Sequence, residues 1–160
     1  MLFRSESDFD AVMNANVKGV WFGLRTCLPT MKQRGYGTIV VIASLAGRMG
    51  TPLLAPYSAS KHAVLGLVRS AARESARHGI RINAIAPGPV RSMMMDRIDA
   101  TLLDIDRNRF GGAKNAETSV PIGRYVTPEE VASVAVFLST ESSRGCTGGV
   151  FAVDGGTGTW

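Results

Sequence analysis

The stretch GTIVVIAS, residues 37–44, decides the fold class of this sequence. It is a continuous apolar run rich in β-branched residues, which is typical of a strand buried on both faces in a parallel sheet. Such a sheet is covered by helices on both of its faces, so the architecture depends on whether helical segments flank this run.

Helical patterns lie on both sides of the strand. Before it, apolar residues recur at intervals of three and four over residues 7–34, which predicts an amphipathic helix with Ser7 or Asp8 as its cap. After it, a loop with two prolines leads into a second predicted helix over residues 55–78, which Gly79 ends.

The rest of the chain continues the alternation. IRINAIAPG, residues 80–88, reads as a second buried strand closed by a Pro-Gly pair, and a long polar loop over 91–120 with a short helix near 96–108 follows. TPEEVASVAVFLST, residues 127–140, predicts a helix with a threonine cap, proline at its first position and glutamate in its first turn. GGVFAVDGG, residues 148–156, is the last predicted strand.

This order of elements predicts an α/β fold with a parallel sheet and right-handed crossovers. No internal repeat, low-complexity tract or linker divides the sequence, so we expect a single domain over residues 1–160. The hydrophobic content of 45% and charged content of 19% are those of a folded globular protein.

The composition also bears on location. The longest apolar runs, such as IVVIA at 39–43, are too short to cross a bilayer, and MLFRSESDFD at 1–10 has no signal-peptide core. The only cysteines, Cys27 and Cys146, do not form a disulfide framework. Reduced thiols and a cytoplasmic location are therefore predicted, with no membrane partner.

Metal and nucleic-acid chemistry have little support. The only histidines, His62 and His78, have no cysteine or carboxylate at metal-ligand spacing, so no metal site is predicted. The formal net charge is +5, and the one ordered basic stripe is Arg69, Arg73 and Arg77 at helical spacing. That stripe is either a solvated helix face or a polyanion site. No aromatic residues interleave with it, so no nucleic-acid partner is predicted.

Tyr57 and Lys61 are the first candidate catalytic residues. They stand four residues apart at the start of the second predicted helix, so their side chains share a face. A free phenol titrates near ~10, and a nearby ammonium favours the phenolate and lowers that pKa by about 1–3 units. The pair is either a tuned acid–base group or a core tyrosine beside a lysine.

Two further polar residues share this context. Ser44 ends the first predicted strand, where ligands bind in parallel α/β sheets, and its hydroxyl beside a phenol suits a carbonyl oxygen. Asn16 stands in the middle of the first predicted helix, in NANVKG. It is either an exposed polar position or an amide that holds a water or interrupts the helix.

These segments together resemble the short-chain dehydrogenase/reductase family. The resemblance rests on NANVKG, IVVIAS, YSASK, INAIAPGPV and TGGVFAVDGG in this order and covers essentially the whole chain. It implies a Rossmann-like doubly wound parallel sheet and an NAD(P)-dependent oxidoreductase. The cofactor implied is NAD or NADP, and the reaction is the interconversion of a secondary alcohol and a ketone by hydride transfer.

The resemblance also implies roles for the catalytic candidates. Tyr57 is the general acid/base, and Lys61 lowers the pKa of that tyrosine and hydrogen-bonds the nicotinamide ribose. Ser44 orients and polarises the substrate oxygen. Asn16 anchors a water in a proton relay to Lys61.

A second set of residues would contact the cofactor together with Tyr57 and Lys61. Pro87, Gly88 and the backbone of Val90 would line the nicotinamide side. Ser92 stands where the family commonly has a threonine that touches the carboxamide, and it keeps the hydroxyl.

One family segment has no counterpart in the sequence. The family begins with a strand, a glycine-rich TGxxxGxG turn and a helix whose N-terminus receives the pyrophosphate, and none precedes the helix predicted at 7–34. The resemblance therefore implies only the C-terminal part of the fold, with the strand at 37–43 exposed at one edge. We expect a fragment or truncated form that lacks the residue choosing between NAD and NADP.

An alternative function is a non-catalytic truncated chain that acts only through oligomer or partner contacts. In the family the two long helices pair with their symmetry mates, which implies a homo-oligomer, a dimer or tetramer, for the full-length form. Ala59, Ala63, Gly66 and Ser70 fit such close helix approach, although packing on the sheet would explain these small residues equally well.

The substrate is predicted only as a small alcohol or ketone with some apolar body. The family closes over its substrate with the segment equivalent to residues 91–120. Five apolar residues of that segment either form an adaptable wall or pack the loop itself: Met93, Met94, Met95, Leu102 and Leu103.

Overall fold

The computed structural model describes residues 5–105 and 120–158, and the side chains of 102–105 lie outside that description. Helices and strands alternate as predicted. The longer elements are α1 (Glu6–Met13), the π-helical segment η1 (Asn14–Lys18), α2 (Gly19–Arg34), β1 (Gly37–Ile42), α3 (Ala55–Ser75), β2 (Ile80–Pro87), α4 (Met93–Ile105), α6 (Pro128–Ser139) and β3 (Val150–Val153). Single 3-10 turns form η2 (Leu45–Gly47), η3 (Ala76–His78) and η4 (Glu141–Ser143).

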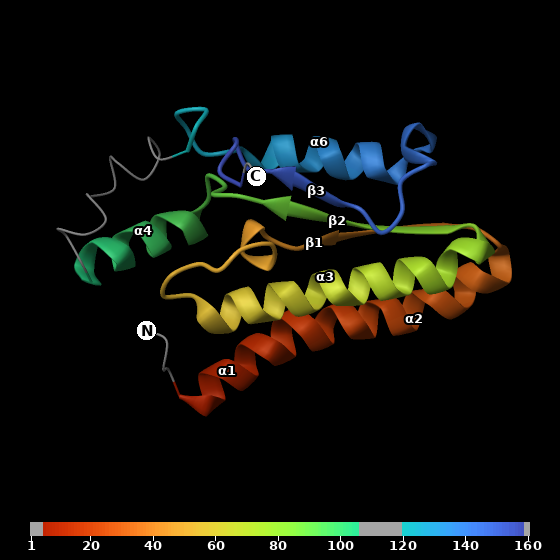
Figure 1. Ribbon diagram of the computed structural model, residues 1–160, viewed down its shortest axis with the longest axis horizontal. Coiled ribbons are helices and arrows are strands. Elements are labelled where there is room, and N and C mark those ends of the chain that lie inside the picture. The colour runs from red at the N-terminus through yellow and green to blue at the C-terminus, as the bar shows by residue number, and fades with distance from the viewer. Residues whose placement is uncertain (1–4, 106–119, 159–160) are drawn as a thin grey trace.

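The strands form one parallel sheet in the order β1-β2-β3. Gly37 pairs with Ile80 at the start of β1, and Ala84 pairs with Val150 at the start of β3. Helices α1, α2 and α3 lie along one side of the sheet and α6 along the other (Figure 1). This is the predicted α/β, Rossmann-like arrangement.

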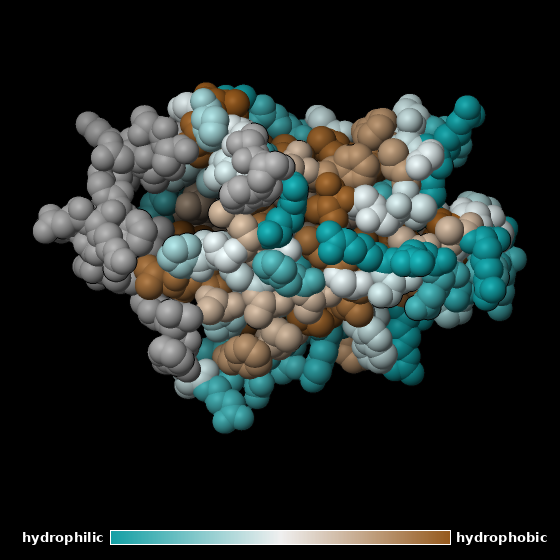
Figure 2. All heavy atoms as spheres, viewed as in Figure 1, coloured by the Kyte–Doolittle hydropathy of each residue, from teal (hydrophilic) through white to brown (hydrophobic). Residues whose placement is uncertain are grey.

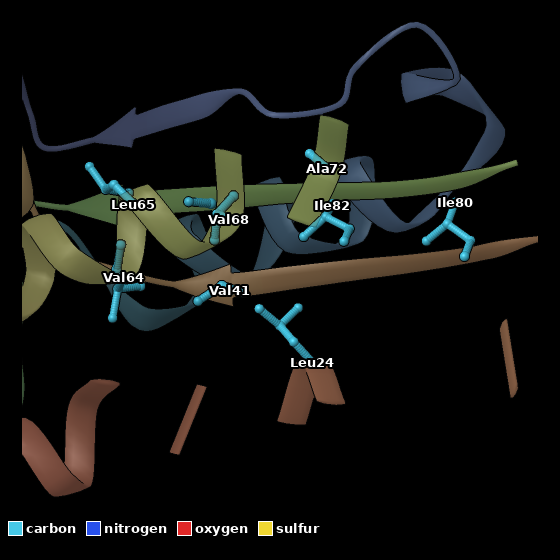
Figure 3. Packing of buried hydrophobic residues seen from close by; sticks show 10 residues of the cluster. Leu24, Val41, Val64, Leu65, Val68, Ala72, Ile80 and Ile82 are labelled. Carbon is cyan, nitrogen blue, oxygen red and sulfur yellow. The ribbon is translucent and has the colours of Figure 1, made fainter. Parts of the chain in front are cut away.

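The main core lies between the sheet and the α2–α3 pair. Figure 3 shows the side chains of α3, β1 and β2 pointing into one cluster, with Leu24 of α2 closing it. Val64, Val68 and Ile82 are completely buried there. The apolar stripe of α3 therefore faces the sheet, as an amphipathic helix requires.

Local signals account for most helix boundaries. Thr127 and Glu130 form the predicted capping box at the start of α6. The predicted helix near 96–108 begins earlier, at Met93, because the hydroxyl of Ser92 accepts the amide of Met95. The last strand is shorter than predicted at both ends, since Gly148 before it and Gly155 and Gly156 after it adopt left-handed φ values of 72°, 62° and 86°. No helix in the described part of the chain is both long and apolar enough to span a bilayer.

The prediction that the first strand is buried on both faces was wrong. Only Val41 of β1 is buried, and Ile42 is 50% exposed on the face that α6 covers incompletely. Within the described residues β1 pairs with β2 alone, so the expected exposed edge is present. Figure 2 shows hydrophobic atoms at the surface between α6 and the α2–α3 pair.

Candidate active site

Ser44 lies just beyond the carboxyl end of β1. Its hydroxyl accepts the backbone N–H of Ala46 at 3.1 Å and thereby caps the 3-10 turn η2. Gly47 ends that turn against α3, where a Cβ would lie only 2.8 Å from the carbonyl oxygen of Lys61. A residue without a side chain is therefore needed to hold the Ser44 turn against the helix that carries Tyr57 and Lys61.

Tyr57 and Lys61 are on one face of the first turns of α3, as predicted. The Lys61 ammonium nitrogen is 5.6 Å from the centroid of the Tyr57 ring. It also donates a hydrogen bond of 3.3 Å to the carbonyl oxygen of Ile42 at the end of β1. Both side chains are half-buried, and burial lowers the pKa of Lys61 from its ordinary value.

Asn16 reaches this helix from the π-helical segment η1. Its amide Nδ2 donates to the hydroxyl of Ser60 at 3.0 Å, and that hydroxyl donates to the carbonyl oxygen of Tyr57 at 2.7 Å. Ser60 is completely buried. Of the alternatives for Asn16, interruption of the α-helix is what the structure contains, and π segments of this kind are frequent at functional sites.

Neither Gly47 nor Ser60 is among the predicted site residues. The available signal for Ser60 was a serine between Tyr57 and Lys61, near the start of an amphipathic helix. Its partner lies 44 residues earlier in the chain, so spacing alone does not identify the pair. Gly47 carries no periodic signal at all.

The predicted cofactor residues lie along the end of β2 and the chain that leaves it. Pro87 pairs with Val153, and a Cβ on Gly88 would lie 2.8 Å from the Cα of Asp154, so Gly88 permits a close chain approach. Val90 forms a parallel bridge with Val126. The Ser92 hydroxyl donates to the carbonyl of Val90 at 3.1 Å while it caps α4, so it is engaged locally.

The arginine stripe lies away from these residues. Arg69 and Arg73 are exposed on α3 and Arg77 on the turn η3 that follows it. An open depression of about 290 Å³ near the C-terminal ends of α2 and α3 is lined by Lys32, Arg73, Glu74 and Arg77. Cations near helix C-termini are favoured by the helix dipole, which accounts for this cluster as a solvated face. The described residues contain no group of three side chains suited to a metal ion.

Comparison with known protein families shows which family the chain belongs to. Residues 2–158 match the family model described as enoyl-(acyl carrier protein) reductase. The match covers nearly the whole sequence and includes every candidate site residue. The chain therefore belongs to the short-chain dehydrogenase/reductase family, and the predicted resemblance is confirmed.

Individual relatives support the same assignment. The chain is 36% identical over 151 residues to 3-oxoacyl-[acyl-carrier-protein] reductase FabG of Thermotoga maritima, over 94% of this chain and 57% of the relative. The crystal structure of levodione reductase matches with a TM-score of 0.90 at 34% identity, over 98% of this chain and 60% of that one. Gluconate 5-dehydrogenase of Burkholderia cenocepacia, in complex with NADP and tartrate, matches with a TM-score of 0.87 at 28% identity, over 98% and 58%. The chain thus spans less than two thirds of the length of these proteins.

Proposed function

We propose that this chain carries the catalytic and substrate-binding part of an NAD(P)-dependent oxidoreductase that interconverts a secondary alcohol and a ketone. The observation that carries the proposal is the set of contacts around the start of α3. Ser60 connects Asn16 to the Tyr57 backbone, and Gly47 seats the Ser44 turn against Lys61. Four polar residues from three separate elements thereby converge on one end of the sheet.

Tyr57 is the group that exchanges a proton with the substrate oxygen. A phenol that transfers a proton needs a group nearby that stabilises the negative charge left on it. Lys61 is a cation beside it, and its ammonium lies 5.6 Å from the ring centroid. In the reduction direction Tyr57 donates its proton to the developing alkoxide, and in the oxidation direction it removes the alcohol proton.

Ser44 holds the substrate oxygen for this transfer. The amide of Ala46 uses an acceptor lone pair of the Ser44 hydroxyl, which leaves the O–H to donate to a carbonyl oxygen. Asn16 has a different task. Its Nδ2 is bound to Ser60, and its side-chain oxygen remains to hold a water of a proton relay toward Lys61.

The residues present fit the nicotinamide-ribose end of a dinucleotide. Among the described residues the Lys61 ammonium has one acceptor, the carbonyl of Ile42, so further N–H groups remain for ribose hydroxyls. Gly88 and Val90 bring the backbone close beside it. The Ser92 hydroxyl donates its proton to Val90 and accepts from Met95, so it keeps one lone pair to accept a hydrogen bond from the cofactor. When bound, the nicotinamide would supply or accept the hydride. The B. cenocepacia enzyme that binds NADP supports this choice of cofactor.

The substrate class rests on the relatives and on the site. Two of the relatives are named as reductases, one of them of a 3-oxoacyl group, and the third is named as a dehydrogenase. A tyrosine acid/base with a serine donor suits proton exchange at the oxygen of a carbonyl–alcohol pair. A small alcohol or ketone is therefore the proposed substrate.

The alternative is a chain that acts through contacts between protein copies alone. Ala59, Gly66 and Ser70 are exposed on α3, so packing on the sheet does not explain these small residues. Phe9 and Phe22 on the neighbouring helices are also exposed, at 43% and 52%. Both observations favour a homo-oligomer built on these helices, and such an assembly is compatible with either function.

Cofactor titration separates the two functions. The 160-residue chain is titrated with NADH and with NADPH while cofactor fluorescence is followed. Saturable binding of either supports the enzyme. An absence of binding to both would refute the claim that this chain is an enzyme by itself and would favour the contact function. Sedimentation of the same sample gives its oligomeric state.

Substitution of Tyr57 tests the chemistry. In the protein form that turns over a ketone, Tyr57→Phe should lower kcat by about 10²–10⁴-fold, because the proton donor is lost while the ring remains. Cofactor affinity should change little. Tyr36→Phe, which removes a phenol that is 66% exposed, is the matched control. Near-normal kcat in Tyr57→Phe would contradict the role given to this residue.

A further inference from the structure

Helix α4 begins directly after the proposed cofactor residues Gly88, Val90 and Ser92. Its N-terminal residue Met93 follows Ser92 directly, and Ser92 caps the helix. The chain has just left the carboxyl end of β2, where ligands bind in parallel α/β sheets. The first turn of α4 therefore borders the proposed substrate site.

Helix α4 departs at two places from the usual pattern of buried apolar and exposed charged side chains. Met93 and Met94 face solvent, with 77% and 72% of their surfaces exposed. Asp99, in contrast, is half-buried on the same side of the helix as Met95 and Ile98. Ordinary packing would place methionines inward and the carboxylate outward, and departures of this kind concentrate at functional sites.

A specific partner explains the inward carboxylate. The hydroxyl of Tyr125 donates a hydrogen bond of 2.8 Å to Oδ2 of Asp99. Tyr125 is only 5% exposed and precedes α6 in the chain. A carboxylate removed from water is costly without a donor, so this bond favours one position of α4 over others.

Tyr125 is itself held firmly by its neighbours. Arg124 beside it forms a double hydrogen bond with Glu130 of α6, at 2.7 and 3.0 Å, and also donates to the Tyr125 carbonyl. On the other side, the Val126 amide donates to Pro89. The tyrosine hydroxyl is thus presented from a fixed part of the molecule.

We infer that the Tyr125–Asp99 hydrogen bond is a tether that orients α4 so that Met93 and Met94 form an adaptable apolar rim of the substrate site. Ser92 fixes the root of the helix, and Asp99 lies seven residues further along, about 10 Å along the helix axis. Two separated attachments define the direction of a helix, whereas one allows it to swing. Tyr125 and Asp99 are then positioning residues, and the methionines determine a preference for substrates with an apolar body.

The inference rests on the proposed function for its substrate claim but not for the tether. Hydrogen exchange of the intact chain, followed by mass spectrometry, tests the tether without any activity. Tyr125→Phe should speed exchange of the amides in residues 93–101 by about tenfold, because the ring stays packed while the bond to Asp99 is lost. Asp99→Ala should do the same, and Asp96→Ala on the exposed side of α4 is the matched control.

The double variant and a conservative variant distinguish the tether from general loosening. In the double variant Tyr125→Phe with Asp99→Ala, the amides of α4 should exchange no faster than in either single variant, because both substitutions remove the same hydrogen bond. Asp99→Asn keeps an acceptor oxygen and should stay close to the parent. If Tyr125→Phe leaves exchange of α4 unchanged, or if the two effects add, the tether is refuted.

Kinetics then test the substrate claim in the form of the protein that reduces a ketone. Tyr125→Phe should raise KM for a long-chain aliphatic ketone by about threefold to tenfold, with little change for acetone and with kcat nearly constant. Met93→Ser with Met94→Ser should show the same discrimination. Faster exchange with an unchanged KM ratio would overturn the positioning role. If the parent reduces no ketone, the proposed function and the substrate claim fail together, while the exchange experiment still decides the tether.

Discussion

Strands β1 and β2 are parallel neighbours with similar apolar sequences, yet they are buried to very different extents. Every residue of β2 is buried except Arg81, which is half-buried, whereas only Val41 is buried in β1. β2 has a strand on each edge and helices on both faces, while β1 has one neighbouring strand in the described part of the chain. The neighbours of a strand, rather than its own sequence, therefore decide how much its side chains stabilise the fold.

Truncation of an isoleucine in each strand should give the largest difference in the free energy of unfolding. Ile82→Ala leaves a cavity at a fully buried position and should lower the free energy of unfolding by about 2–5 kcal/mol. Ile42→Ala removes the same atoms from a half-exposed position and should cost less than about 1 kcal/mol. Urea denaturation of both variants measures the difference. Equal losses would show that β1 is covered in solution.

Arg81 of β2 hydrogen-bonds to β1, so its substitution tests how strongly the two strands depend on each other. Its guanidinium donates to Thr38 of β1 and to the carbonyls of Leu138 and Thr140 at the end of α6. Arg81→Lys keeps the charge but cannot reach all of these acceptors, and should lower the free energy of unfolding by about 1.5–3 kcal/mol. Arg69→Lys on the exposed face of α3 is the control. Equal urea midpoints for the two variants would argue against the connecting role.

The smallest expected effect concerns α6, the helix that covers β2 but leaves Ile42 exposed. Hydrogen bonds from Arg124 and the Thr127 amide lower the pKa of Glu130 from its ordinary value of 4.5 to about 2. The ionised carboxylate is therefore favoured in the folded state, and its contribution is fully present above about pH 4.5 and is lost as the pH falls through 2. The gain is modest because the side chains of Arg124 and Glu130 are 47% and 41% exposed, so water screens the pair.

The pH dependence is measured against Glu130→Gln. The parent should have the higher urea midpoint at pH 6, and the difference between the two proteins should shrink steadily toward pH 2.5. A difference that stays constant over this range would mean that the charge of Glu130 does not stabilise the fold.

Several elements were predictable because their signals are local. Thr127, Pro128 and Glu130 specify the start of α6 through bonds within four residues, and the structure has all of them. The Tyr57–Lys61 pair was predictable because residues four apart share a helix face. An interruption of the helix at Asn16 was only one of the predicted alternatives, and its π-helical form was not predicted, since the bond to Ser60 depends on how α3 packs.

The amino-acid sequence by itself determined the alternation of helices and strands and the side chains that meet within one helix, because regular backbone geometry fixes which neighbours share a face. The tertiary structure decided what distant segments do to each other. It placed Gly47 against Lys61, joined Asn16 to Ser60 and Asp99 to Tyr125, and left Ile42 half-exposed. Each of these depends on the packing of elements far apart in the chain, which no local pattern specifies.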